Sequence, residues 1–316
     1  MTSLGPSFDS IESGQVYPRH GVVAFIFVGR NGIRAGWRLL LFILITTIVG
    51  FLLGSVLPGA VRGVGRGSGP NVVLLQDGIG FLSLVVAGAV MARIESRSFA
   101  HYALPLQGAL GVRFWFGILW GFAALSALLL AIRAGHGFSF GTVALHGRQL
   151  TGYAALWAMA FVFVGGFEEF LMRGYALYTL TTGMGFWPSA VLLSAIFGAG
   201  HLTNVGESWV GGLAAAFVGL FFSFTVRRTG DLWFAIGLHA SWDYSESFLY
   251  SVPDSGATVK GHLLNSSFHG PAWLTGGSVG PEGSALVFLV IGVMFVIFHR
   301  LYPYVRFPSV VSRPTG

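Results

Sequence analysis

Stretches of about 20 mostly apolar residues, the length a helix needs to cross a membrane, recur along almost the whole chain. Only short breaks separate them. We expect transmembrane helices at eight places, which are 37–57, 72–92, 114–132, 152–178, 187–201, 209–226, 232–249 and 285–300. The sequence therefore predicts an all-α polytopic membrane protein, folded as a bundle of about eight transmembrane helices.

The same pattern predicts one transmembrane domain at 37–302, between a cytoplasmic N-terminal segment at 1–36 and a C-terminal tail at 303–316. The composition agrees, because 9% of the residues are charged and a soluble domain carries about 25%. Cysteine is absent, which excludes disulfides, thiolate metal sites and a cysteine nucleophile. The net charge is +6, but the basic residues form no continuous stripe, so we expect no nucleic-acid partner.

The basic residues are distributed unevenly between the two ends of the predicted helices. If the N-terminus is cytoplasmic, those inside are Arg19, Arg30, Arg34, Arg38, Arg93, Arg97, Arg113, Arg227, Arg228, Arg300, Arg306 and Arg313. Those outside are Arg62, Arg66, Arg133, Arg148 and Lys260. Membrane proteins keep their excess of Lys and Arg in the cytoplasm. We therefore predict a multi-pass protein of the cell (inner) membrane, with both termini cytoplasmic and the long loop 252–283 outside.

Three of the predicted helices carry ionisable residues, each of which costs about 2.5 to 3.5 kcal/mol near the centre of a membrane helix. They are Glu168, Glu169 and Arg173 in the fourth helix, His201 in the fifth, and His239, Asp243 and Glu246 in the seventh. A cost of this size indicates a function. We expect a polar cavity within the membrane, lined by these three helices.

Helical spacing divides the first group. Residues four apart share a helix face, so Glu169 is expected to form a structural ion pair with Arg173. Glu168 points about 100° away and is free to face the cavity. The alternative is that all three side chains form one ion-pair cluster that only holds helices together.

The other two groups show the same spacing of four. Phe197 is expected to pack against the imidazole of His201. His239 and Asp243 share a face, which suits a histidine held by a carboxylate, a pair of metal ligands, or a buried polar pair between helices.

Together the groups read Glu168-Glu169-x-x-x-Arg173, Phe197-x-x-x-His201 and His239-x-x-x-Asp243, in this order on three separate helices. In these motifs, EExxxR, FxxxH and HxxxN/D, the chain resembles the CPBP family of intramembrane peptidases. The family includes the type II CAAX prenyl endopeptidases and the bacterial Abi, or bacteriocin self-immunity, proteins. The resemblance places a CPBP-like core at about 150–250. It implies an intramembrane endopeptidase whose site opens to the cytoplasm and whose substrate is a membrane-associated protein or lipid-modified peptide, such as a prenylated CAAX protein.

The resemblance also implies roles for the residues. Glu168, helped by His201, activates a water molecule, while His239 and Asp243 stabilise the oxyanion, and Glu169 belongs to the same catalytic group. Asp243 departs from the CAAX endopeptidases, which carry Asn there, because an ionised Asp cannot donate a hydrogen bond to an oxyanion. Either Asp243 is protonated, or it orients His239, or the protein belongs to the bacterial branch and has a different substrate.

Three alternatives are compatible with the sequence. The glutamate mechanism requires no cofactor, but Glu168, His201, His239 and Asp243 are also suitable ligands for zinc, as in a metalloendopeptidase. Buried Glu and His residues also serve membrane transporters and proton relays, or persist in a non-catalytic membrane regulator.

Overall fold

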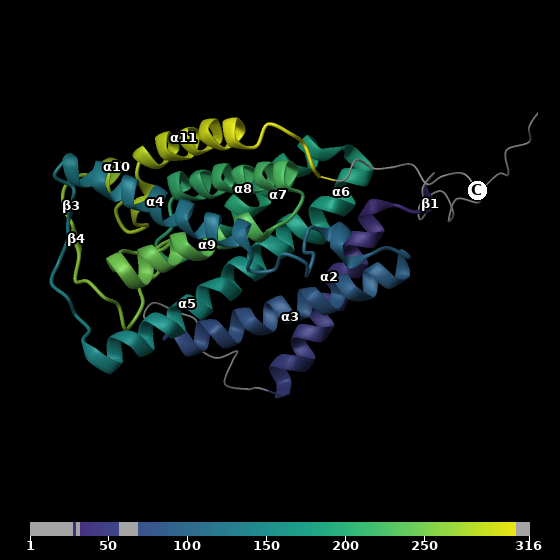
Figure 1. Ribbon diagram of the computed structural model, residues 1–316, viewed down its shortest axis with the longest axis horizontal. Helices are drawn as coiled ribbons and strands as arrows, with labels where there is room; N and C mark the ends of the chain where they lie inside the picture. Colours follow the sequence, from purple (N-terminus) through teal and green to yellow (C-terminus); the bar gives the residue numbers. More distant parts are fainter. Residues whose placement is uncertain (1–27, 30–31, 57–68, 308–316) are drawn as a thin grey trace, which may run out of the picture.

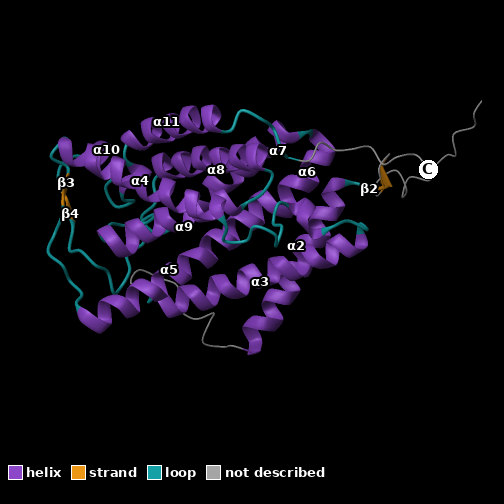
Figure 2. Ribbon diagram, viewed as in Figure 1, coloured by secondary structure: helices purple, strands orange, loops and turns teal. Residues whose placement is uncertain are grey.

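The computed structural model describes residues 28–29, 32–56 and 69–307, and within them it is a bundle of helices (Figure 1). The predicted 1–36 segment, the 303–316 tail and the break after the first helix lie wholly or partly outside the described residues. Strands are limited to four two-residue pieces in the described part (Figure 2). The prediction of an all-α polytopic membrane protein is confirmed.

The helices follow the chain in order. The α-helices are α2 (Ala35–Val56), α3 (Pro70–Ile94), α4 (Val112–Ala134), α5 (Gly147–Glu169), α6 (Leu177–Met184), α7 (Phe186–His201), α8 (Trp209–Thr229), α9 (Trp233–Tyr244), α10 (Ala272–Thr275) and α11 (Leu286–Leu301). Two π-helices, η2 (Phe170–Ala176) and η3 (Ser245–Tyr250), continue α5 and α9. Two short 3₁₀-helices are η1 (Phe99–Tyr102) and η4 (Pro281–Gly283). The antiparallel strand pairs are β1 (Val28–Gly29) with β2 (Gly32–Ile33), and β3 (Phe138–Ser139) with β4 (Ser267–Phe268).

Each of the eight predicted spans corresponds to a helix or to a continuous run of helices. Five are long and apolar enough to cross a membrane, namely α2, α3, α4, the run 147–184 and α8. Both α7 and α11 have 16 residues, about 24 Å of helix, which is shorter than the roughly 30 Å hydrocarbon core. The seventh predicted span, α9 with η3, carries the buried polar residues and is absent from that set of five.

The outer surface of the bundle is apolar. Helix α2 exposes large side chains on much of its surface, among them Leu40, Leu44, Phe51 and Leu52. Soluble monomers rarely expose apolar patches of this kind, because the side chains would face water. The described residues thus form a multi-pass membrane protein whose exposed apolar side chains face lipid.

Glycines allow α4 and α9 to pack closely, and this contact fixes the helix that carries His239. A Cβ atom at Gly117 would overlap the carbonyl oxygen of Phe234, and one at Gly121 would overlap that of Leu238. Small residues at such an interface let two helix backbones approach each other. The Gly117 and Gly121 spacing therefore serves close helix packing.

Candidate active site

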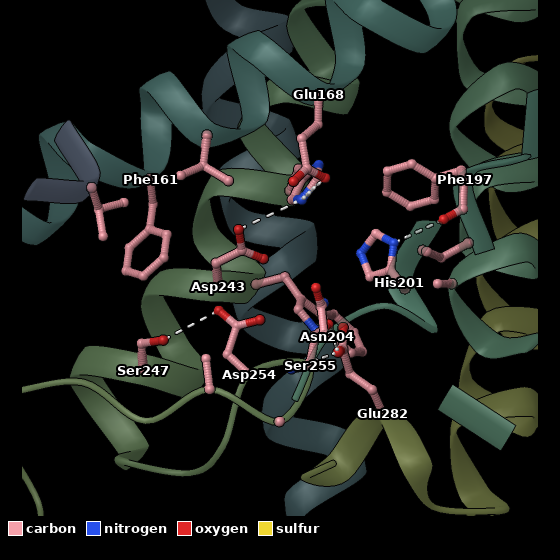
Figure 3. Close-up of a pocket in the computed structure, with 18 of the residues that line it drawn as sticks. Phe161, Glu168, Phe197, His201, Asn204, Asp243, Ser247, Asp254, Ser255 and Glu282 are labelled. Carbon is pink, nitrogen blue, oxygen red and sulfur yellow. Dashed lines mark hydrogen bonds and ion pairs between the residues drawn. The ribbon is translucent and has the colours of Figure 1, made fainter. Parts of the chain in front are cut away.

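A pocket of about 600 Å³ lies among α3, α5, α7, α8 and α9, next to the loop that follows η3 (Figure 3). Its polar lining includes four of the residues singled out in the sequence, Glu168, His201, His239 and Asp243. Helices α5, α7 and α9 are the fourth, fifth and seventh predicted spans, so the predicted three-helix lining is present. Side chains from α3, α8 and α11 complete the wall.

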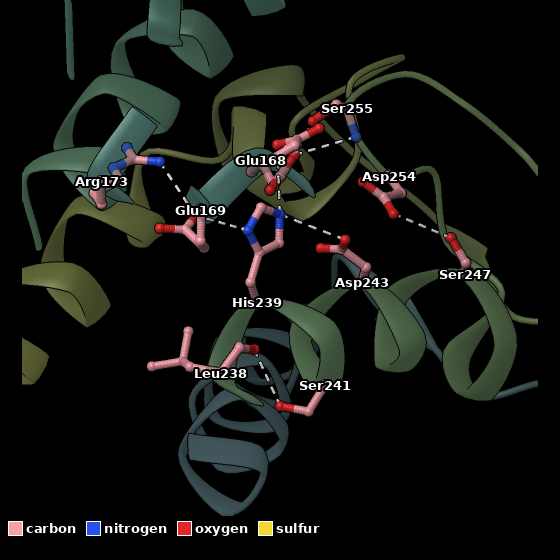
Figure 4. A network of polar contacts seen from close by, with 11 residues as sticks. Glu168, Glu169, Arg173, Leu238, His239, Ser241, Asp243, Ser247, Asp254 and Ser255 are labelled. Atoms are coloured by element: carbon pink, nitrogen blue, oxygen red, sulfur yellow. Dashed lines mark hydrogen bonds and ion pairs between the residues drawn. The ribbon is translucent and has the colours of Figure 1, made fainter. Parts of the chain in front are cut away.

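Glu169 lies behind the pocket, in a fully buried ion pair. Its Oε1 atom is 3.1 Å from Nη1 of Arg173, and neither side chain is exposed to solvent (Figure 4). Neither residue lines the pocket. The predicted structural pair of Glu169 and Arg173 is thus formed, and Glu169 can act on a substrate only through its neighbours.

Aromatic rings enclose the guanidinium of Arg173. Its central carbon lies 4.4 Å from the ring centroid of Phe197 and 5.6 Å from that of Phe222. A Cβ atom at Gly219 of α8 would overlap the guanidinium, so only glycine leaves room for it there. The Phe of the second motif therefore has two contacts, one with Arg173 and one with His201.

Glu168 points into the pocket, unlike its neighbour in sequence. Its side chain retains 29% of its exposure, and Oε2 lies 3.7 Å from Nε2 of His239. The separation of Glu168 from Glu169 follows from the helical rotation of about 100° between adjacent residues. Of the two glutamates, Glu168 is the one that a water molecule in the pocket can reach.

His239 is held by both of its ring nitrogens. Nδ1 lies 2.9 Å from Oε1 of Glu169, while Nε2 lies 3.5 Å from Oδ2 of Asp243. The ring stacks on Phe222, with centroids 5.3 Å apart and planes inclined by 12°. Because a carboxylate only accepts hydrogen bonds, Nδ1 donates to Glu169. The carboxylate nearest to His239 is therefore that of Glu169, and this contact joins α9 to α5. Asp243 lies on the side of the ring that faces the pocket.

His201 lies across the pocket from Glu168 (Figure 3). Its Nδ1 atom donates to the backbone carbonyl of Phe197 over 2.9 Å, and the two rings pack with centroids 4.4 Å apart. The predicted contact between Phe197 and His201 is confirmed. In the neutral ring this hydrogen bond leaves Nε2 as an acceptor, which can hold a water molecule in the pocket.

The sequence reasoning missed several polar residues of the pocket. Asp77 and Gln76 come from α3, Asn204 from the turn after α7, and Asp254 and Glu282 from the long loop 252–283. Asp77 lies close enough to Glu168 and His239 to interact with both electrostatically. An acidic residue inside an apolar span was a signal for Asp77. No comparable signal marked the loop residues.

Three acidic side chains that could bind a metal ion lie together in the described part of the structure, and none of them belongs to the predicted set of ligands. Among the described residues, the acidic or histidine side chains that bring three ligand atoms within 4.8 Å of one another are Glu246, Asp254 and Glu282. The zinc candidates Glu168, His201, His239 and Asp243 are spread along the pocket wall, with Nε2 of His239 at 3.7 Å from Glu168 and 3.5 Å from Asp243.

Residues 150–245 match a family model described as type II CAAX prenyl endopeptidase Rce1-like. This segment of the chain is similar to that family. Within the matched segment, α5, α7 and α9 carry the three motifs, and α8 supplies the packing around Arg173. None of the curated proteins compared with the chain matches it.

Proposed function

We propose that the protein is an intramembrane endopeptidase in which Glu168 activates a water molecule for attack on a peptide bond. The observation that carries this proposal is the division of the paired glutamates. Glu169 is paired with Arg173 and His239. Glu168, in contrast, faces a pocket that His201 also lines. A carboxylate and an imidazole acceptor on opposite walls can hold one water molecule between them.

In this mechanism Glu168 takes a proton from the water as the oxygen attacks the carbonyl carbon of the substrate. The carbonyl oxygen then becomes negatively charged and requires hydrogen-bond donors. Nε2 of His239, once protonated, and a protonated Asp243 are the two donors that face the pocket. Glu168 finally returns its proton to the leaving amine, and the C–N bond breaks. Glu169 and Arg173 keep the His239 ring in place.

The decisive variant is Glu168→Gln, which preserves the volume of the side chain and removes its ability to accept a proton. We expect hydrolysis of a fluorogenic farnesylated CAAX peptide, or of any peptide the wild type cleaves, to fall by about 10² to 10⁴. The control is Arg148→Ala, a change at an exposed residue near the start of α5 and outside the pocket lining, which should retain wild-type activity. Wild-type hydrolysis by Glu168→Gln would remove Glu168 from the mechanism.

The same assay separates the alternatives. In the glutamate mechanism, activity should survive a chelator and the purified protein should need no stoichiometric zinc. Loss of activity in chelator, with recovery on adding zinc, would favour the metalloendopeptidase. If no peptide is cleaved while proton or solute flux across vesicles depends on Glu168, the transporter hypothesis replaces the peptidase. A protein with neither activity would be a membrane regulator.

We also propose the orientation in which both termini are cytoplasmic. At one end of the described helices lie Arg34, Arg38, Arg93, Arg97, Arg113, Arg227, Arg228, Arg300 and Arg306, and at the other lie Arg133, Arg148 and Lys260. This bias supports a cytoplasmic position for the first end. The part of the pocket lined by Asn204, 254–259 and Glu282 lies at the other end. The pocket therefore opens outward in this orientation, in contrast to the cytoplasmic opening that the motifs alone imply.

An outward opening changes the class of substrate that we propose. The cleaved bond would belong to a membrane-associated peptide presented in the outer half of the bilayer. The absence of cysteine makes the test direct. Asn204→Cys should react with a membrane-impermeant maleimide on intact cells, and Ala100→Cys, in η1 between α3 and α4, only after permeabilisation. The reverse labelling would establish a cytoplasmic opening and favour prenylated CAAX proteins.

A further inference from the structure

Three carboxylates that the peptidase mechanism does not use meet beside the pocket. Glu246 comes from η3, Asp254 from the turn that follows, and Glu282 from η4 just before α11. One oxygen of each lies within 4.8 Å of the others. Figure 3 shows Asp254 and Glu282 on the pocket wall with Ser255 between them. Segments separated by 36 residues thus bring three acidic groups to one point.

Glu246 has no partner that accounts for its burial. The residue has 0% exposure, and neither carboxylate oxygen has a hydrogen-bond partner of normal geometry, although the Trp242 indole is near. Asp254 and Glu282 receive hydrogen bonds only from neutral groups, Oγ of Ser247 and the backbone N and Oγ of Ser255. An isolated buried carboxylate is costly unless a positive charge or enough donors accompany it.

No ion pair in the part of the chain that the structure describes provides such a positive charge. The ion pairs there involve Glu95, Glu168, Glu169, Asp231 and Asp243, and none includes a carboxylate of this cluster. Burial, together with the nearby Asp243 and Glu282 carboxylates, raises the pKa of Asp254 well above its ordinary value, against a smaller opposing effect of Ser247 and His239. A bound cation would supply the missing charge.

We propose that Glu246, Asp254 and Glu282 form a binding site for a divalent cation, Ca²⁺, at the mouth of the pocket. The ligand atoms are all oxygens, with no imidazole or thiolate, which favours hard cations such as Ca²⁺ over zinc. The ligands come from a helix end, a turn and a short 3₁₀-helix. Ca²⁺ accepts such irregular arrangements, whereas Mg²⁺ requires a nearly regular octahedron.

A cation at this point joins the segments that shape the mouth. The turn is closed by reciprocal backbone hydrogen bonds between Asp254 and Ala257, of 2.9 and 2.8 Å, and residues 254–259 line the pocket. Binding ties this turn to η3, which continues α9, and to η4, which precedes α11. The site is thus a structural clamp on the pocket mouth, and it does not depend on whether Glu168 is the catalytic base.

The test uses the full chain, purified in detergent and stripped with a chelator. We expect Ca²⁺ to raise the thermal unfolding midpoint by several degrees, with saturation in the millimolar range typical of extracellular calcium sites, and Mg²⁺ to raise it less. Tb³⁺ should bind the same site and luminesce on excitation of tryptophan, because Trp242 lies beside Glu246.

The variant Glu246→Gln should abolish both responses, and without a cation it should be as stable as the wild type or more stable, because it removes an uncompensated buried charge. Arg148→Ala, at an exposed residue near the start of α5 and outside the pocket lining, is the control and should keep both responses. If Ca²⁺ leaves the wild-type midpoint unchanged, or if Glu246→Gln responds like the wild type, the site is refuted. Should Glu246→Gln fail to fold, Asp254→Asn provides the same comparison. Loss of peptidase activity in Glu168→Gln would leave these results unchanged.

Discussion

Arg173→Ala should destabilise the protein severely, although Arg173 does not reach the pocket. The guanidinium is fully buried, pairs with Glu169 at 3.1 Å and lies between the rings of Phe197 and Phe222. Removing it leaves the Glu169 carboxylate buried with only His239 as a partner. Breaking a buried ion pair in this way costs about 3 to 5 kcal/mol.

That energy corresponds to a fall in the unfolding midpoint of roughly 6 to 20 °C, if each kcal/mol shifts it by about 2 to 4 °C. The assay is thermal unfolding of the detergent-purified protein, monitored as loss of its monodisperse size-exclusion peak. Arg148→Ala is the matched control, because Arg148 is exposed near the start of the same helix, α5. Its midpoint should lie close to that of the wild type.

A double variant separates the lost charge from the lost volume. Arg173→Met fills much of the space but still leaves Glu169 uncompensated, so it should remain unstable. Adding Glu169→Gln to Arg173→Met removes the unpaired buried charge. The double variant should recover more than half of the decrease in unfolding midpoint, since replacing a whole buried ion pair is often neutral for stability. If Arg173→Ala is inactive but as stable as Arg148→Ala, then Arg173 acts on the substrate and our structural assignment is wrong.

Further outcomes follow from the same geometry. His201→Ala should lower peptide hydrolysis by about 10² or more, and full activity would exclude it from holding the water. Asp243→Asn should preserve activity and extend it to higher pH if Asp243 donates to the oxyanion, whereas a collapse at every pH would indicate that its charge orients His239 or binds a metal. Gly121→Ala should destabilise the protein by about 1 to 3 kcal/mol through overlap with α9, measurable as a lower unfolding midpoint. Reporters fused after Arg306 should read cytoplasmic and those in 252–283 external, and the reverse would overturn the orientation.

Hydrophobic stretches were sufficient to predict the helices, because a membrane span needs a minimum apolar length. The limits of α7 agree with the predicted 187–201 to within one residue. Local spacing was also sufficient for contacts within one helix, such as Glu169 with Arg173 and Phe197 with His201. Both depend only on the helical repeat, which the sequence displays directly.

Contacts between different helices could not be predicted from residue spacing along the sequence. Spacing along α9 suggested Asp243 as the partner of His239, yet the shorter contact, of 2.9 Å, is with Glu169 of α5. The long loop brings η4 back beside η3 and the turn that follows it. No periodic pattern in the sequence predicts this conformation of the loop. Glu246 stands out in the sequence as an ionisable residue in a predicted membrane helix, whereas its neighbours Asp254 and Glu282 lie in the long loop 252–283, where acidic residues are ordinary.

The π-helix η2 begins directly after Glu169 and continues to Ala176, with Gly174 outside helical geometry at φ −82° and ψ −114°. A π-turn holds one more residue than an α-turn, so it accommodates one extra residue without rotating the helix that follows. If these residues formed a regular α-helix of the same length, the extra residue would rotate α6 by about 100° relative to α5. The buried Leu177 and Leu180 would then leave the core while the paired glutamates stayed in place. The stretch 174–176, beyond Arg173, should therefore tolerate the deletion of one residue far better than the insertion of one, and a scan of single deletions and insertions there would reveal this as retained against lost expression.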